Sequence, residues 1–200
     1  MGTDAIKYID KIDKDSILED ILETQTTYGN HILILYSDPA DFRYLYLNYI
    51  KRSLQSLNEI VLMLPYYHAE TDIITNLRNT GIDINRYKKE GSIVIVQSKK
   101  AHYSLNQEFV GVKIMTKMLL RRLDKLQKAG LSIISDTGLF FHINKLDDLI
   151  KYEAELLPSI NDIKAKLLCF YNKSDFDMLI EHMQEDLFKS HDNKVIDISI

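Results

Sequence analysis

Compact apolar runs recur along the chain, separated by polar turns and amphipathic segments. The runs have the length of strands and are rich in aliphatic and β-branched side chains, which favour β-structure. The predicted strands are 31–36, 60–65, 92–97, 131–136 and 165–171, with a further short strand at 82–87. Most of these runs are continuously apolar, which is typical of strands buried on both faces. The pattern therefore predicts an α/β fold with a mainly parallel central sheet and helices on both faces.

The segments between the strands predict the helices. Asp38 and Pro39 supply a cap and a first helical residue, and Gly81 supplies a helix stop. Besides the helix that begins at Pro39, the predicted helices are 69–80, 107–129, 144–158 and 174–189. Ser16 and Glu19 match a capping box and predict a short helix near the N-terminus. We divide the chain into an N-terminal helical extension, residues 1–26, and one α/β domain, residues 27–200.

Length, charge and cysteine content narrow the class of protein. A chain of 200 residues suits one domain, and a net charge of −4 disfavours nucleic acid as a partner. Cys169 is the single cysteine, so no internal disulfide can form, which fits a reducing cytoplasm. No apolar segment approaches the roughly 20 residues that cross a bilayer, and no signal peptide is recognisable. We expect a cytoplasmic protein that neither inserts into a membrane nor binds nucleic acid.

Polar and aromatic residues follow the predicted strands. In an open parallel sheet, ligands bind in the crevice at the carboxyl ends of the strands. Tyrosine and histidine combine apolar faces with polar tips, so they suit a small, partly apolar ligand. The candidate ligand-binding residues are Tyr36, Asp38, Tyr67, His68, His102, Tyr103 and Asp136. Ordinary turn chemistry, in a chain with 12 tyrosines, would also explain these positions.

The turn after the first strand, residues 37–43, lacks the features of a phosphate-binding loop. It contains no glycine and no lysine, and two aspartates would repel a triphosphate. Asp136 ends an apolar strand, where nucleotide hydrolases place a magnesium-binding carboxylate, but a cap on the turn into Gly138 is the favoured interpretation. ATP hydrolysis is therefore disfavoured.

Nucleophilic and metal chemistry also find little support. The six histidines form no HxxxH, HExxH or Cys/His cluster along the chain. His31 begins its strand, at the opposite end from His68 and His102, and each is interpreted as a structural histidine. Cys169 is interpreted as a small buried hydrophobic residue, and Glu153 as a carboxylate without a matching acid. We expect a non-enzymatic protein with no catalytic residue, no metal and no cofactor.

The predicted helix 107–129 carries one basic stripe. Its residues are Lys113, Lys117, Arg121, Lys125 and Lys128, at spacings of three or four. A solvated helix face explains this stripe, and an anionic partner is the alternative.

Several short stretches have a characteristic order and spacing. They are 31–36, 77–83, 129–130, 135–138, 152–153, 168–171 and His191. Together they resemble the MEDS domain, the sensory domain of the DcmR regulator and of methanogen and methylotroph proteins, over about residues 27–197. The resemblance implies a RecA/KaiC-like fold without the phosphate-binding loop and a sensory role, with small hydrocarbon derivatives as proposed ligands. Family members are often fused to kinase or DNA-binding modules, and neither is visible here.

The residues and the resemblance together predict a non-enzymatic sensory or regulatory domain. It would bind a small molecule at the carboxyl edge of its sheet and signal to a separate protein or through self-association. Two alternatives stay open. One is residual nucleotide binding or slow hydrolysis, and the other is a scaffold that docks proteins through the basic helix or the N-terminal helix.

Overall fold

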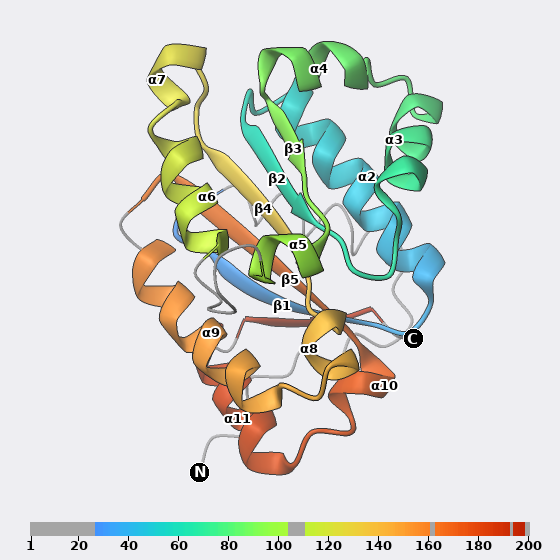
Figure 1. Ribbon diagram of the computed structural model, residues 1–200, viewed down its shortest axis with the longest axis vertical. Helices are drawn as coiled ribbons and strands as arrows, with labels where there is room; N and C mark the ends of the chain where they lie inside the picture. Colours follow the sequence, from blue (N-terminus) through green and yellow to red (C-terminus); the bar gives the residue numbers. More distant parts are fainter. Residues whose placement is uncertain (1–26, 104–110, 161–162, 193, 199–200) are drawn as a thin grey trace.

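A parallel β-sheet forms the centre of the computed structural model, which describes residues 27–103, 111–160, 163–192 and 194–198 (Figure 1). Its strands are β1 (His31–Tyr36), β2 (Ile60–Leu64), β3 (Ile93–Ile95), β4 (Leu131–Asp136), β5 (Ala165–Asn172) and β6 (Val195–Asp197). Within the described ranges these six strands form one sheet in the order β3-β2-β4-β5-β1-β6, and every neighbouring pair is parallel. The predicted α/β class and parallel sheet are confirmed.

Helices cover both faces of the sheet (Figure 1). One face carries α2 (Pro39–Gln55), α3 (Glu70–Asn79) and α4 (Ile84–Glu90). The other carries α5 (Ser98–Tyr103), α6 (Gly111–Leu120), α7 (Leu123–Leu126), α8 (Gly138–His142), α9 (Leu146–Ile160), α10 (Lys173–Phe176) and α11 (Glu181–Ser190). Within the described residues, no helix combines the length and the apolar character that a membrane span requires.

The side chains of strand β1 pack into two apolar cores, one on each face of the sheet. Ile32 and Ile34 pack into the core beneath α2, whereas Leu33 and Leu35 pack into the core on the other face. Successive side chains of a strand point to opposite faces, so a strand between two helical layers must be apolar at nearly every position. The continuous apolar runs of the sequence meet this requirement.

Capping residues determine where several helices begin and end. The Asp38 carboxylate accepts a hydrogen bond of 2.7 Å from the amide two residues later, as its predicted capping role requires. The prediction of a strand at 82–87 is wrong, because this segment forms the start of α4. Asp83 caps that helix by accepting from the amide of Arg86, and Gly91 ends it with φ of +75°. Local side-chain hydrogen bonds therefore override the apolar character of the segment.

Other helix boundaries differ from the predictions. The described part of 107–129 is divided into α6 and α7, and 174–189 is divided into α10 and α11. Asn172 caps α10 by accepting a hydrogen bond from the amide of Ser174, and Asn144 takes φ of +54° in the turn before α9. The short elements α5, α8 and β6 were not predicted, because so few residues carry no clear periodicity. The predicted extension 1–26 lies outside the described residues.

An ion pair is buried near the amino end of the sheet. The Nζ of Lys166, in β5, lies 2.9 Å from Oε1 of Glu59, and each side chain is only 1% exposed. Ser132 of β4 donates to the other carboxylate oxygen of Glu59 at 2.5 Å. Burial lowers the pKa of Lys166, while the charge of Glu59 opposes this change. The two charges therefore depend on each other for compensation.

We expect Lys166→Met to lower the free energy of unfolding by about 3–5 kcal/mol, because it leaves Glu59 buried without a counter-ion. The double variant Lys166→Met/Glu59→Gln removes both charges and should recover most of this loss. Urea unfolding followed by circular dichroism measures both effects. An unchanged urea midpoint in the single variant would show that the pair contributes nothing to stability.

Candidate functional site

The carboxyl ends of β1, β4 and β5 lie side by side at one edge of the sheet. The strand register places Tyr36 opposite Asn172 and Asp136 opposite Phe170. The chain leaves β1 through α2 on one face and leaves β5 through α10 on the other. In open α/β sheets, ligands bind at the carboxyl ends of strands whose connections diverge in this way. The strand ends named in the sequence analysis therefore lie at one edge, and the ligand site there stays a prediction.

Asp136 is buried at this edge and accepts three hydrogen bonds from backbone amides. Its Oδ2 accepts from Tyr66 and Tyr67, each at 3.0 Å, and its Oδ1 accepts from Gly138 at 3.1 Å. Burial raises the pKa of Asp136 to about 6, although these bonds oppose the shift. The contact with Gly138 confirms the interpretation of Asp136 as a turn cap.

Tyr67 lies across the same edge and is 49% exposed. Its hydroxyl donates to Asp175 of α10 at 2.5 Å, and burial and Asp175 raise its pKa. Its ring lies so close to Gly138 that a Cβ at that position would come within 2.3 Å of it. Tyr67 therefore links the turn after β2 to the turn after β4 and to α10.

The face beneath α2 holds three more of the predicted ligand-binding residues. Tyr36 is buried and stacks on Phe42, with 5.0 Å between ring centroids. Burial, followed by the charge of Asp136, raises the pKa of Tyr36. His68 packs its ring edge-on against Phe42 at 5.3 Å, and Asp38 is exposed at the start of α2. Tyr36 and Asp136 are thus close to Tyr67, whereas His68 lies toward α2.

His102 is separated from these residues by the sheet. It is buried on the opposite face, with Phe140 and Tyr152 each 5.1 Å from its ring centroid. Burial lowers the pKa of His102 to about 4. The side chain of Tyr103 lies outside the described part of the structure. The position of a residue after a parallel strand predicts the edge of the sheet at which it lies, but not the face of the sheet.

The turn between β1 and α2 leaves little room for a phosphate-binding loop. Only Ser37 and Asp38 separate the strand from the helix. The Asp38 carboxylate already accepts from an amide at the helix start, where a phosphate would bind. The structure thus agrees with the sequence in offering no phosphate cradle here.

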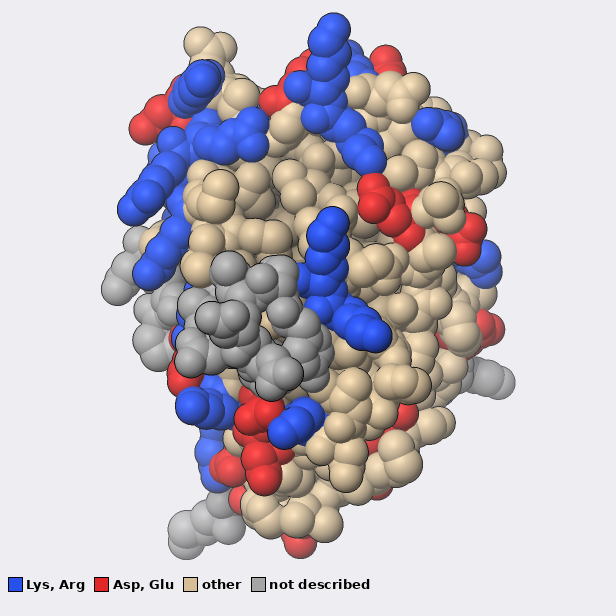
Figure 2. All heavy atoms as spheres, viewed as in Figure 1, with Lys and Arg blue, Asp and Glu red and all other residues tan. Residues whose placement is uncertain are grey.

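The basic stripe predicted on 107–129 lies on the surface. Lys117, Arg121 and Lys125 are exposed, and Lys113 pairs with Glu155 of α9. Figure 2 shows Lys and Arg side chains spread over α6 and α7, along the left of the view. Lys128 is half-buried and donates to Asn58, and the exposure of the other three fits a solvated helix face.

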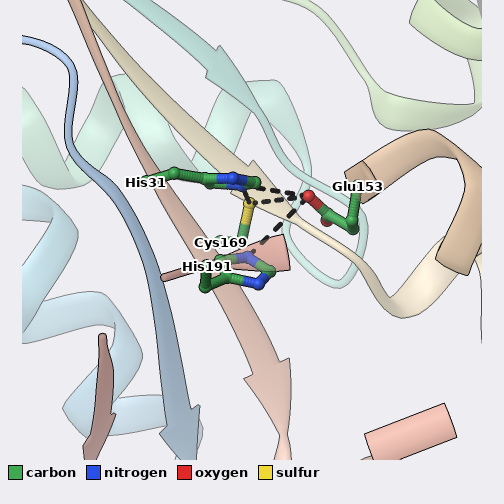
Figure 3. A group of neighbouring side chains, drawn as sticks. All are labelled: His31, Glu153, Cys169 and His191. Carbon is green, nitrogen blue, oxygen red and sulfur yellow. Dashed lines mark hydrogen bonds and ion pairs between the residues drawn. The ribbon is translucent and has the colours of Figure 1, made fainter. Parts of the chain in front are cut away.

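A second polar group is buried between the sheet and the helices α9 and α11 (Figure 3). It consists of His31 at the start of β1, Glu153 of α9, Cys169 of β5 and His191, which follows α11. We call these four residues the His31 cluster. None of the four has exposed surface, and their potential ligand atoms all lie within 4.8 Å of one another.

Glu153 contacts every other member of the His31 cluster. Its Oε2 lies 3.0 Å from Nε2 of His31 and 3.6 Å from Sγ of Cys169. The same oxygen lies 3.8 Å from Nε2 of His191. Tyr171 donates a hydrogen bond of 3.0 Å to Oε1. The carboxylate is therefore surrounded by donor atoms on both of its oxygens.

The environment determines the protonation of the cluster. Burial raises the pKa of Glu153, but the hydrogen bond from His31 and the neighbouring imidazoles bring it below its ordinary value. Burial lowers the pKa of His191 to about 3 and raises that of the Cys169 thiol. Near neutral pH, an ionised carboxylate thus faces two imidazole rings and a protonated thiol.

Comparison with known proteins identifies the family. Residues 30–192 match the family model of MEDS, the methanogen/methylotroph, DcmR sensory domain. The chain belongs to the MEDS family. No protein of curated function matches it by sequence. Among solved structures, it is similar to a KaiC-like protein from the hyperthermophilic archaeon Pyrococcus horikoshii OT3, with a TM-score of 0.54 and 13% identity over 80% of this chain and 70% of that chain. The KaiC-like, RecA-type fold implied by the resemblance is confirmed, as is a sensory family.

No sequence motif marks the His31 cluster in this MEDS domain. Its members are spread from position 31 to position 191 and have no recognisable ligand spacing. His31 and Cys169 are buried, as interpreted, but their neighbours came from distant segments. The one signal in the sequence was that all four residues lie in the stretches that carry the resemblance to MEDS domains.

We expect the carboxyl group of Asp136 to titrate near pH 6, against an ordinary value of 3.8. The folded state then binds this proton more tightly than the unfolded state, so the stability contributed by Asp136 falls as the pH rises from about 4 to 6. Carboxyl-carbon NMR shifts measure the titration, and Asp136→Asn should remove the signal. Titration below pH 4 would show that the three amides outweigh burial.

Proposed function

We propose that this MEDS domain is a non-enzymatic sensor that binds a small, partly apolar molecule at the carboxyl edge of its sheet. Small hydrocarbon derivatives are the ligand class that the family resemblance implies. The signal would pass to a separate protein or to a second copy of the chain. The main support for this site is the half-exposed Tyr67. It follows β2, lies against Gly138 after β4 and donates to Asp175 after β5.

Tyr67 offers the two kinds of contact that such a ligand requires. Its exposed ring provides an apolar face, and its hydroxyl and Asp175 provide a donor and an acceptor at the solvent boundary. The carboxylate of Asp136 accepts hydrogen bonds from the backbone amides of Tyr66 and Tyr67. The contact surface is therefore supported by a rigid strand end, as a binding site needs.

A path from this edge to a partner begins at Asp175. This residue lies in α10, and the segment after α10 exposes Met178 by 67% and Ile180 by 58%. Neighbouring exposed apolar side chains suit contact with another protein. A ligand that replaces the bond between Tyr67 and Asp175 would shift the population of α10 conformations that a partner contacts.

The absence of a phosphate cradle after β1 supports a role without nucleotide hydrolysis. Helix α2 begins at Pro39, and its free amides are already capped by Asp38. No residue of the carboxyl edge is therefore assigned a catalytic step.

A thermal-shift screen against short-chain alcohols, aldehydes and halogenated hydrocarbons tests the site, since ligands that bind the folded state raise the melting temperature. We expect at least one compound to stabilise the protein and to bind Tyr67→Ala about tenfold more weakly, a loss of roughly 1.4 kcal/mol. Tyr44→Ala is the matched control, because it removes a tyrosine of similar exposure, 45%, from α2. A ligand whose affinity is unchanged in Tyr67→Ala would exclude this site.

Gly138→Ala tests the position of the Tyr67 ring without altering Tyr67 itself. The added Cβ would come within 2.3 Å of the ring of Tyr67 and 2.8 Å of the ring of Tyr66, so both rings must move away from the turn after β4. Because Tyr67 is half-exposed, we expect the free energy of unfolding to change by less than about 1 kcal/mol while ligand affinity falls. Ring-proton NMR of Tyr67 and ligand titration measure the two effects, and unchanged affinity with a displaced ring would contradict the proposal.

A further inference from the structure

The His31 cluster lies apart from the carboxyl edge, and the proposed sensing of a small molecule does not use it. Its side chains come from β1, β5, α9 and the residue after α11, and they converge on one point (Figure 3). Because none of them has exposed surface, any charge or lone pair in the cluster must be satisfied inside the protein.

The orientation of His191 is the first observation that points to a bound ion. Its Nδ1 lies 2.7 Å from the carbonyl oxygen of Leu187, so this nitrogen carries the proton and donates it. If Nδ1 carries the single proton of a neutral ring, Nε2 offers only a lone pair. It is buried, has no hydrogen-bond partner among the described residues, and faces the carboxylate of Glu153 at 3.8 Å. A cation between the lone pair of this nitrogen and the carboxylate of Glu153 would satisfy both groups inside the protein.

The dimensions of the cluster fit a tetrahedral ion. Zinc binds nitrogen and oxygen at about 2.0–2.2 Å and sulfur at about 2.3 Å, so neighbouring ligand atoms lie roughly 3.3–3.6 Å apart. In the His31 cluster, Nε2 of His31 lies 3.4 Å from Sγ of Cys169. The three distances from Oε2 of Glu153 to the other ligand atoms are 3.0, 3.6 and 3.8 Å. The remaining pairs of ligand atoms lie within 4.8 Å of each other, so a bound tetrahedral ion would draw these atoms closer together.

We propose that the His31 cluster binds one divalent transition-metal ion through four protein ligands, and that this ion is zinc. Two imidazoles, a thiolate and a carboxylate form a mixed donor set that suits Zn²⁺. When the ion binds, the thiol of Cys169 releases its proton to solvent. The two negative ligands then balance the two positive charges of the ion, so the occupied site is neutral.

Contacts around the cluster support the same assignment. Metal-binding histidines usually donate their other ring nitrogen to a carbonyl or carboxylate, as His191 does to Leu187, whereas Nδ1 of His31 has no hydrogen-bond partner among the described residues. The hydroxyl of Tyr171 orients the carboxylate by donating to its second oxygen. The ring of His31 stacks on that of His191, with 3.9 Å between centroids. These contacts hold the donor atoms in place.

Four protein ligands without exposed surface indicate a structural site, because a catalytic zinc site keeps one position open for water or substrate. The ion would join α9 and the end of α11 to β1 and β5. Its binding therefore contributes to the stability of the folded chain.

Refolding of the full chain tests the proposal, since a buried site is best loaded as the protein folds. The chain is unfolded with a chelator, freed of metal, and refolded with Zn²⁺, with Co²⁺ or without metal. We expect one zinc per chain after desalting and a higher melting temperature than without metal. The cobalt form should absorb as a four-coordinate ion bound to a thiolate. Failure to retain stoichiometric zinc, or cobalt bound without the thiolate band, would overturn the proposal.

Two variants locate the ion. In Cys169→Ser the thiolate band of the cobalt form should disappear, whereas His182→Ala, which removes an exposed histidine from α11, should leave it unchanged. Tyr171→Phe keeps the ring and removes only the bond to Glu153, so it should fold and bind zinc about 10–100-fold more weakly. Unchanged affinity in Tyr171→Phe would remove Glu153 from the ligands and with it the four-ligand site.

Discussion

Helices cover both faces of the parallel sheet, and the resulting exclusion of water governs how polar groups are placed inside the protein. A buried carboxylate costs several kcal/mol unless charges or hydrogen bonds compensate it, and three of them lie in the described interior. Glu59 is paired with Lys166, and Asp136 is bound by three backbone amides. Glu153 is surrounded by imidazoles, a thiol and a phenol. Each of the three carboxylates is therefore compensated by neighbouring groups at one position of an otherwise apolar core.

The two candidate sites are connected by the C-terminal part of the chain. Strand β5 contributes Cys169 to the His31 cluster and then leads into α10, where Asp175 binds Tyr67. Helix α11 follows, and His191 directly after it returns to the buried cluster. The segment 173–190 thus connects the exposed hydrogen bond of Tyr67 with the buried His31 cluster.

Much of the fold could be predicted because its signals are local. The strands β1, β2, β4 and β5 appear as apolar runs of the right length, and the Asp38 cap marks the start of α2. Where two local signals competed, the prediction failed: the apolar positions of 82–87 suggested a strand, but the cap at Asp83 starts a helix. The edge that carries Tyr67 and Asp136 could also be predicted, because parallel strands end on the same side.

Local patterns in the sequence predict the main strands, the parallel sheet and the edge at which the strands end, since periodicity and capping depend on neighbouring residues. Only the tertiary structure decided which residues share a face and which distant residues meet. It separated His102 from Tyr36 and Asp136, although all three lie at or near the same edge. It also brought His31 within contact of His191, because the strand order and the packing of α11 place the two rings together. Such contacts depend on the arrangement of whole elements, which no local pattern encodes.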